Sequence, residues 1–307
     1  MSIVEKAVEK LKTQPPESTP VPPPEAAPTP SPAPVHAAPT VERAQERARV
    51  VERPVETTPP WHVDTTALKR MGLLPADAET ERRLADELRT VKQPLLANAI
   101  GKGAETFLHG KRIVVTSAEA GEGKTFAAVN LALSLAREAD FEVLLVDGDV
   151  PKSDITRIFG LSGKLGLMDV LADEQRAPAD AIVQTDVPNL MVVPAGVSHP
   201  LAAELFRSRR MEHVLDELGG RNRRRLLVFD SSPLLATSES QVLASHVGQV
   251  VLVVAAGRTR RQSVNSALRR LNDLQYVGLI LNMSRSPTGE NYYNRQSHYL
   301  RALTGGA

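Results

Sequence analysis

Apolar runs and helical patterns alternate along the chain from residue 112 onward. The apolar runs are rich in Val, Ile and Leu and have the length of strands; they span residues 112–117, 142–147, 189–195, 225–231, 249–256 and 276–282. Because these runs are continuously apolar, we expect strands that are covered on both faces. Helical patterns lie between them, at residues 124–138, 202–218, 237–247 and 260–274. This alternation predicts an α/β fold with a doubly wound, mostly parallel sheet.

A further helical pattern precedes the first strand. It covers residues 78–100 and contains Pro94. We expect this proline to kink or end the helix, because proline removes a backbone donor and clashes with the preceding turn. The pattern leads directly into the alternating segments. We therefore predict one domain over residues 78–284, with this helical segment at its start.

The N-terminal part of the chain differs in composition from the rest. Of the 23 prolines, 14 lie in residues 15–60, so residues 14–77 are predicted to be a disordered, Pro-rich linker. Residues 1–13 carry apolar positions at helical spacing among Glu and Lys residues, which predicts a short amphipathic helix. Two interpretations of this helix stay open. It is a marginal helix that frays alone, since about ten residues rarely hold one in water, or it docks on a partner or a membrane surface.

Composition excludes several classes of function. Lys and Arg total 37 and Asp and Glu 36, so nucleic acid is not expected as a partner. The chain has no cysteine, which rules out disulfides, thiol catalysis and Cys-bound metals and suits a reducing cytosol. No signal peptide and no apolar run of about 18 residues is present. We expect a cytoplasmic protein that reaches a membrane only peripherally or through a partner.

The first strand runs directly into a glycine-rich loop, SAEAGEGKTF, at residues 117–126. A strand before the loop and a helix after it are the setting of a phosphate-binding P-loop. Glycines let backbone N–H groups approach the phosphates, the helix N-terminus favours negative charge, and the lysine and threonine serve phosphate and Mg²⁺. Ala118 replaces the leading glycine, which is acceptable if its φ is negative. The predicted nucleotide-binding residues are Gly121, Glu122, Gly123, Lys124, Thr125 and Phe126.

Two other strands end in carboxylates. Asp147 and Asp149 follow the second strand, and Asp230 follows a later one. Because the carboxyl ends of parallel strands meet at one crevice, all three acids are expected beside the P-loop. They favour a Mg²⁺ site with Thr125, Asp147 and Asp230 as ligands, directly or through water. An alternative stays open for each acid, which is that it caps the following helix or turn.

The ordered motifs resemble the bacterial tyrosine kinases of capsular and exopolysaccharide synthesis, the BY-kinase family, and most of all its exosortase-associated branch. Septum-site and plasmid-partition ATPases share the acid pair but carry a second P-loop lysine, where this chain has Glu119. Ser232 stands where the family usually has a proline, and Pro151 stands where it has an arginine. The resemblance rests on the segments SAEAGEGKT, VLLVDGDVPKSD, VVPAGVSHPLAAELFRSRRM and LLVFDSSPLLATSE and on the C-terminal tyrosine cluster.

The resemblance implies an ATP- and Mg²⁺-dependent protein-tyrosine autokinase. Lys124, Asp147 and Asp149 are the predicted catalytic residues. A tyrosine hydroxyl has a pKa near 10 and needs a base, and Asp149 is our choice. The phosphoacceptors are Tyr292, Tyr293 and Tyr299, three of the four tyrosines, in a flexible tail over residues 285–307.

The resemblance also implies phosphorylation in trans within a homo-oligomer, such as a ring. Asp86, Arg89 and Lys92 match the family's assembly motif in charge. The alternative is an ordinary solvated helix face with an i, i+3 ion pair. Implied partners are a transmembrane polysaccharide co-polymerase at the inner membrane and a protein tyrosine phosphatase. A different function stays open: a P-loop ATPase that acts as a nucleotide-dependent assembly scaffold without kinase activity.

Overall fold

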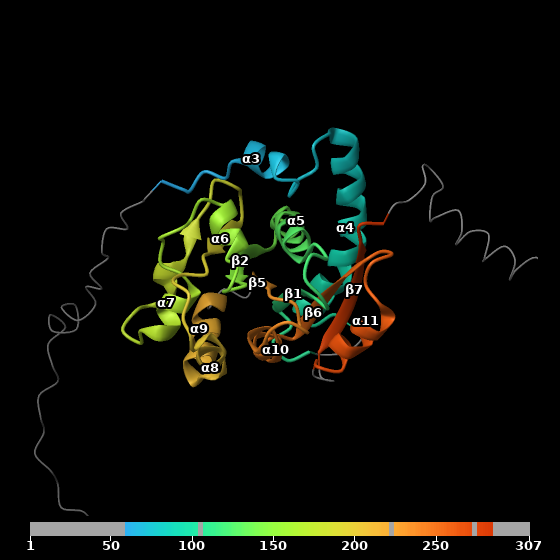
Figure 1. Cartoon of the computed structure of the whole chain (residues 1–307). Helices are drawn as coiled ribbons and strands as arrows, with labels where there is room; N and C mark the ends of the chain where they lie inside the picture. Colours follow the sequence, from blue (N-terminus) through green and yellow to red (C-terminus); the bar gives the residue numbers. More distant parts are fainter. Residues whose placement is uncertain (1–58, 104–106, 221–223, 272–274, 285–307) are drawn as a thin grey trace, which may run out of the picture. The chain divides into compact units, whose positions relative to one another are not determined.

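The computed structural model describes residues 59–103, 107–220, 224–271 and 275–284. The predicted N-terminal helix, most of the Pro-rich linker and the tyrosine-cluster tail lie outside these residues. A seven-stranded sheet forms the centre, in the order β3-β4-β2-β5-β1-β6-β7 (Figure 1). The strands are β1 (Arg112–Ser117), β2 (Glu142–Gly148), β3 (Val183–Gln184), β4 (Leu190–Val193), β5 (Arg225–Ser231), β6 (Gln249–Ala255) and β7 (Tyr276–Asn282).

All neighbouring strands pair in parallel except the short edge strand β3, which runs antiparallel to β4. The prediction of a mostly parallel sheet is therefore confirmed. The helices between the strands are α5 (Lys124–Ala136), α6 (Asp154–Ile158), α7 (Leu167–Ala172), η2 (Pro178–Ala181), α8 (Ala202–Arg207), α9 (Arg209–Gly219), α10 (Ser238–Ser245) and α11 (Arg261–Leu268). Two more helices, α3 (Thr65–Arg70) and α4 (Ala78–Ala99), precede β1.

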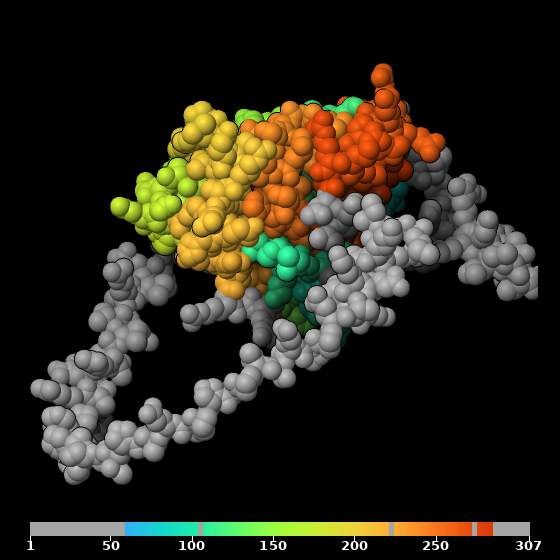
Figure 2. All heavy atoms as spheres, turned by 90° about the horizontal axis from the view of Figure 1, so that it is seen from below, coloured from blue at the N-terminus to red at the C-terminus, as the bar shows by residue number. Residues whose placement is uncertain are grey.

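Successive residues of the central strands enter two different cores. Ile113 and Val115 pack with α4 and α5 on one face, while Val114 packs with α7 to α11 on the other. Figure 1 shows α4 and α5 on one side of the sheet and α8 to α10 on the opposite side. Figure 2 looks onto the second side, where the yellow and orange segments of α8 to α11 cover the strands. Both faces of the central strands are thus buried, as their continuous apolar runs predicted. The prediction was wrong for β7, which lies at the edge of the sheet and leaves Leu279 and Leu281 exposed.

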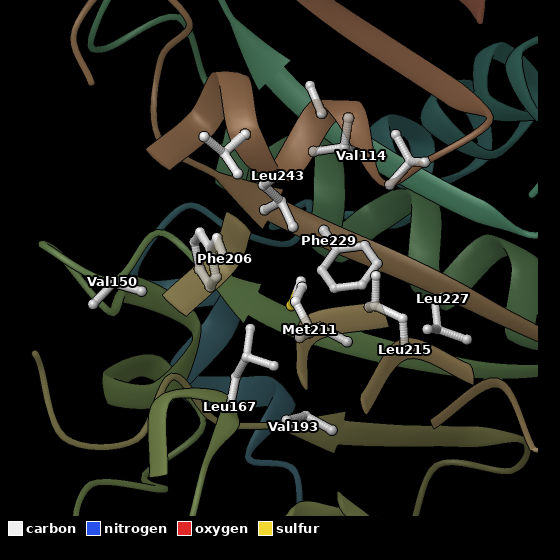
Figure 3. Packing of buried hydrophobic residues seen from close by; sticks show 14 of the residues in the cluster. Val114, Val150, Leu167, Val193, Phe206, Met211, Leu215, Leu227, Phe229 and Leu243 are labelled. Atoms are coloured by element: carbon white, nitrogen blue, oxygen red, sulfur yellow. The ribbon is translucent and has the colours of Figure 1, made fainter. Parts of the chain in front are cut away.

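The second core joins the sheet to the helices around the predicted acid pair. Phe206 of α8 and Met211 of α9 lie in the same cluster as Phe229 of β5 (Figure 3). Leu167 of α7 and Leu243 of α10 belong to it as well. This packing fixes the ends of β2 and β5, from which the predicted acids project.

The predicted linker ends earlier than residue 77, which corrects the sequence-based boundary. Trp61 forms a parallel bridge with Thr185, and its indole N–H donates to the carbonyl of Phe159 at 2.8 Å. Asp64 caps α3, whose Leu68 is buried in the core. A helix of six residues is too short to leave a periodic signal, and the prolines just before it set the composition. Residues 59–77 therefore belong to the folded domain.

Helix α4 keeps its predicted range, whereas the helical segment predicted over residues 202–218 differs from the prediction. Helix α4 continues through Pro94 to Ala99, because Leu88, Leu95 and Ala99 hold it in the core. The helix predicted over residues 202–218 is two helices. Ser208 is extended and its hydroxyl accepts from the backbone N–H of Met211, so it ends α8 and caps α9. In the part of the chain that the structure describes, none of the helices is both long and apolar enough to cross a membrane.

Candidate active site

The P-loop has the backbone that its glycines were expected to allow. Gly121 has φ 80° and Gly123 has φ 88°, a left-handed region that favours glycine. A Cβ on Gly123 would also lie 2.1 Å from the amide nitrogen of Asn282. Ala118 has no positive φ and is fully buried, so its replacement of the leading glycine costs nothing in backbone strain. Gly123 is the N-cap of α5, and the loop therefore faces the helix N-terminus as a phosphate site requires.

Two neighbouring segments, residues 258–259 and the end of β7, make hydrogen bonds to the P-loop. The carboxylate of Glu122 is buried and accepts from the backbone N–H of Glu119 at 2.7 Å and from the hydroxyl of Thr259. The amide of Asn282, at the end of β7, donates to the carbonyl of Glu122 at 2.9 Å. The guanidinium of Arg258 lies 3.4 Å from the carbonyl of Gly121. The side chain of Glu122 thus stabilises the loop. Only the backbone of Glu122 is left to face a nucleotide.

The three predicted acids and Lys124 meet at the carboxyl edge of the sheet. Asp147 of β2 stands directly opposite Asp230 of β5 in the strand register. Both are fully buried, and Asp149 is almost so. The ammonium of Lys124 lies 2.6 Å from Oδ2 of Asp149 and 4.0 Å from Oδ1 of Asp230. The structure therefore brings the predicted catalytic residues into one buried cluster.

Burial and neighbouring charges set the protonation of this cluster. Burial raises the pKa of Asp230 to about 7, although the charge of Lys124 acts in the opposite direction. Burial likewise raises the pKa of Asp147 to about 6, against two hydrogen bonds from Thr156. Burial alone would lower the pKa of Lys124, but the charges of Asp230 and Asp149 outweigh it and raise that pKa. One lysine thus faces more negative charge than it can balance near neutral pH.

Two hydroxyls each donate a hydrogen bond to the acid pair, one to Asp147 and one to Asp149. Oδ2 of Asp147 accepts from the backbone N–H and the hydroxyl of Thr156, at 2.8 and 2.6 Å. Oδ1 of Asp149 accepts from the hydroxyl of Ser232 at 2.6 Å. Thr156 was not foreseen as a site residue, and Ser232 was noted only as a departure from the family pattern. A buried threonine shortly after an acid pair gives no recognisable signal in one sequence.

The chemistry of the cluster fits a cation. Oδ1 of Asp147 and both oxygens of Asp230 are buried without a hydrogen-bond donor, which is costly unless a cation is bound or a proton is taken up. Among the described residues, no group of three or more His, Cys, Asp or Glu side chains forms a metal cage. Mg²⁺ does not require one, because it usually keeps several waters and uses one or two carboxylates together with substrate phosphates.

The predicted assembly residues on α4 differ in their surroundings. Asp86 and Arg89 are exposed and form an i, i+3 ion pair at 3.4 Å. Lys92 instead packs against α5, where its ammonium lies 2.6 Å from Glu138 and donates to the carbonyl of Ser134 at 3.2 Å. In this structure Lys92 ties α4 to the end of α5 and is not a free surface charge. The tyrosine cluster lies outside the described residues.

A protein family and several known proteins resemble this chain over more than half of its length. The AAA domain family matches residues 110–276. The tyrosine-protein kinase CpsD of Streptococcus agalactiae is 32% identical over 175 residues, 56% of this chain and 75% of that protein. The tyrosine-protein kinase YwqD of Bacillus subtilis is 29% identical over 195 residues, 62% of this chain and 81% of that protein.

Solved structures agree with these relatives. The kinase domain of the Escherichia coli tyrosine kinase ETK has 27% identity and a TM-score of 0.52, and the match covers 59% of this chain and 72% of that one. The BceF tyrosine kinase domain has 27% identity and a TM-score of 0.55, with 71% and 86% covered. The P-loop, the acid pair and the acid of β5 all lie within residues 110–276, which the AAA domain family matches. The chain therefore belongs to the bacterial tyrosine kinase family, with a nucleotide-binding domain of the AAA type.

Proposed function

We propose that this protein is an ATP- and Mg²⁺-dependent tyrosine autokinase that phosphorylates Tyr292, Tyr293 and Tyr299 of its own C-terminal segment. The observation that carries the proposal is the buried cluster in which Lys124 of the P-loop contacts Asp149 and faces Asp230. Phosphoryl transfer depends on positioning and on charge neutralisation more than on covalent chemistry. A P-loop beside three buried carboxylates supplies both.

The nucleotide is held by the P-loop. Backbone N–H groups of residues 121–125 and the start of α5 face the phosphates, and the ammonium of Lys124 balances part of their charge. Thr125, Asp147 and Asp230 would hold Mg²⁺, directly or through water. Bound there, Mg²⁺ would supply positive charge that neutralises the phosphate oxygens.

Asp149 is the general base of this proposal. Its Oδ2 lies 2.6 Å from the ammonium of Lys124, and an oxygen held in that ion pair is not available for proton transfer. A triphosphate competes for the same ammonium, since it carries more negative charge than one carboxylate. When Lys124 turns to the phosphates, Oδ2 becomes free to accept the proton of a tyrosine hydroxyl within hydrogen-bond reach. Base activation would thus depend on nucleotide binding.

The biological setting is part of the proposal. Phosphorylation occurs in trans in a homo-oligomer, for which Asp86 and Arg89 are the exposed candidates on α4. The kinase acts in the cytoplasm beside the inner membrane and regulates exopolysaccharide synthesis and export. Its partners there are a transmembrane polysaccharide co-polymerase and a protein tyrosine phosphatase, as the family resemblance implies.

The direct test is incubation of the full chain with ATP and Mg²⁺, followed by mass spectrometry of the tail. We expect phosphate on one or more of the three tail tyrosines, none in Lys124→Met, and none in Asp149→Asn although that variant still binds nucleotide. Release of free phosphate without tyrosine label would refute the kinase and support the nucleotide-dependent scaffold. Loss of nucleotide binding in Asp149→Asn would assign Asp149 to the metal.

A further inference from the structure

Ser232 contacts Asp149 from a different strand, and its own position is fixed. Its hydroxyl donates to Oδ1 of Asp149 at 2.6 Å, and the residue is 2% exposed. The hydroxyls of Thr116 and Ser231 both donate to the backbone carbonyl of Ser232, at 2.9 and 3.1 Å. Strand β5, which precedes Ser232, pairs with β2. The serine is therefore anchored by its backbone while its hydroxyl reaches across to the acid.

The contact restricts how the carboxylate of Asp149 can turn. The torsion that rotates a carboxylate is soft and broad, so one bonded oxygen is needed to define the direction of the other. A short hydrogen bond from a hydroxyl to an ionised oxygen is among the stronger kinds. With Oδ1 held by Ser232, Oδ2 is directed toward Lys124, 2.6 Å away. That is the side on which the P-loop lies.

The two acids of the pair differ in how they are held. Asp147 accepts from both the backbone N–H and the hydroxyl of Thr156. Among the described residues, Asp149 receives its side-chain contacts from Ser232 and Lys124 alone. If Lys124 turns to a nucleotide, Ser232 is the donor that still holds Asp149.

We propose that Ser232 is a positioning residue for phosphotransfer, which fixes the carboxylate of Asp149 so that its other oxygen faces the reacting tyrosine. The inference rests on the proposed role of Asp149 as general base. It also gives a function to the serine that replaces the family's usual proline, because proline carries no hydroxyl. A misdirected base lowers the rate of transfer and leaves nucleotide affinity unchanged, since reaction depends on near-attack geometry.

The test compares Ser232→Ala with Ser240→Ala in the full chain. Both remove one buried hydroxyl, but the hydroxyl of Ser240, in α10, donates to the backbone carbonyls of Pro233 and Thr237 and not to Asp149. The first measurement is the rate constant of tyrosine phosphorylation at saturating ATP and Mg²⁺, divided by the concentration of nucleotide-binding sites. The second is the dissociation constant of a fluorescent ADP analogue. Counting sites removes any effect of a reduced folded fraction.

We expect Ser232→Ala to slow phosphorylation about tenfold or more, the effect of losing a hydrogen bond to a charged group. Its nucleotide affinity should stay within about twofold of the wild type. Ser240→Ala should resemble the wild type in both, and Ser232→Thr, which keeps a hydroxyl, should recover most of the rate. A wild-type rate in Ser232→Ala, an equal slowing in Ser240→Ala, or no recovery in Ser232→Thr would overturn the inference.

Asp149→Asn distinguishes the positioning role of Ser232 from the role of Asp149 as general base. If it is inactive while Ser232→Ala is fully active, only the positioning role is lost and the proposed function stands. If Asp149→Asn phosphorylates tyrosine at the wild-type rate, Asp149 is not the base. The inference about Ser232 then fails together with that part of the proposed function.

Discussion

Asp230→Asn should change how the stability of the nucleotide-free protein depends on pH. The carboxyl group of Asp230 is fully buried, and its pKa is raised from an ordinary 3.8 to about 7. The folded state therefore holds this proton more tightly than the unfolded state does. The stabilisation from the protonated form is complete below a pH of about 3.8 and is lost as the pH rises through about 7. Stability should fall with rising pH in this window.

The size of this change in unfolding free energy follows from the shift in the pKa of Asp230. A rise of about three pKa units corresponds to roughly 4 kcal/mol of differential interaction between the two protonation states. Between about pH 5.5 and pH 8 the linkage relation assigns roughly 2 kcal/mol of that loss to Asp230. Asparagine has a similar shape and no proton to lose, so the variant should lack this part of the pH dependence. Asp147, whose pKa is about 6, continues to titrate in both proteins.

The assay is urea unfolding of the full chain with EDTA and without nucleotide, at several pH values across this range. The free energy of unfolding of the wild type should fall relative to that of Asp230→Asn by roughly 2 kcal/mol from the lowest to the highest pH. Asp140→Asn is the control, because the side chain of Asp140 is 83% exposed; it should follow the wild type. Parallel curves for the wild type and Asp230→Asn would refute the raised pKa.

Four further predictions concern the loop, helix α4 and the domain boundary. Gly123→Ala should lower nucleotide affinity at least tenfold in a fluorescence titration, because φ 88° and the contact with Asn282 exclude a side chain; unchanged affinity would contradict the loop geometry. Lys92→Ala should cost roughly 1–2 kcal/mol in urea unfolding, since Lys92 bridges α4 and α5. Arg89→Ala should cost about 0.5 kcal/mol or less, but should weaken self-association in sedimentation if the α4 surface assembles. A chain starting at residue 78 should melt several degrees below one starting at residue 59, because it lacks Trp61 and Leu68. Equal melting temperatures would mean that residues 59–77 are part of the linker and not of the folded domain.

Local patterns in the sequence were sufficient for the fold class and for much of the site. The P-loop could be predicted because its residues are consecutive and each has a local task. Asp147 and Asp230 could be placed together because parallel strands bring their carboxyl ends to one edge of the sheet, and the strand register confirms it. Phosphoacceptor tyrosines and the N-terminal helix remain predictions, since they lie outside the described residues.

Contacts between distant positions came only from the tertiary structure. Ser232 and Asp149 are 83 residues apart, and Trp61 and Phe159 are 98 apart. From the sequence alone Lys92 is expected to be a surface charge, but in the structure it forms an ion pair with Glu138 at the end of α5. Periodicity reports which face of an element is buried, but a hydrogen bond needs two side chains at one distance and angle. The sequence by itself determined the main strands, the P-loop and the chemistry they carry, while packing decided the short elements and which hydroxyl, carboxylate and ammonium meet.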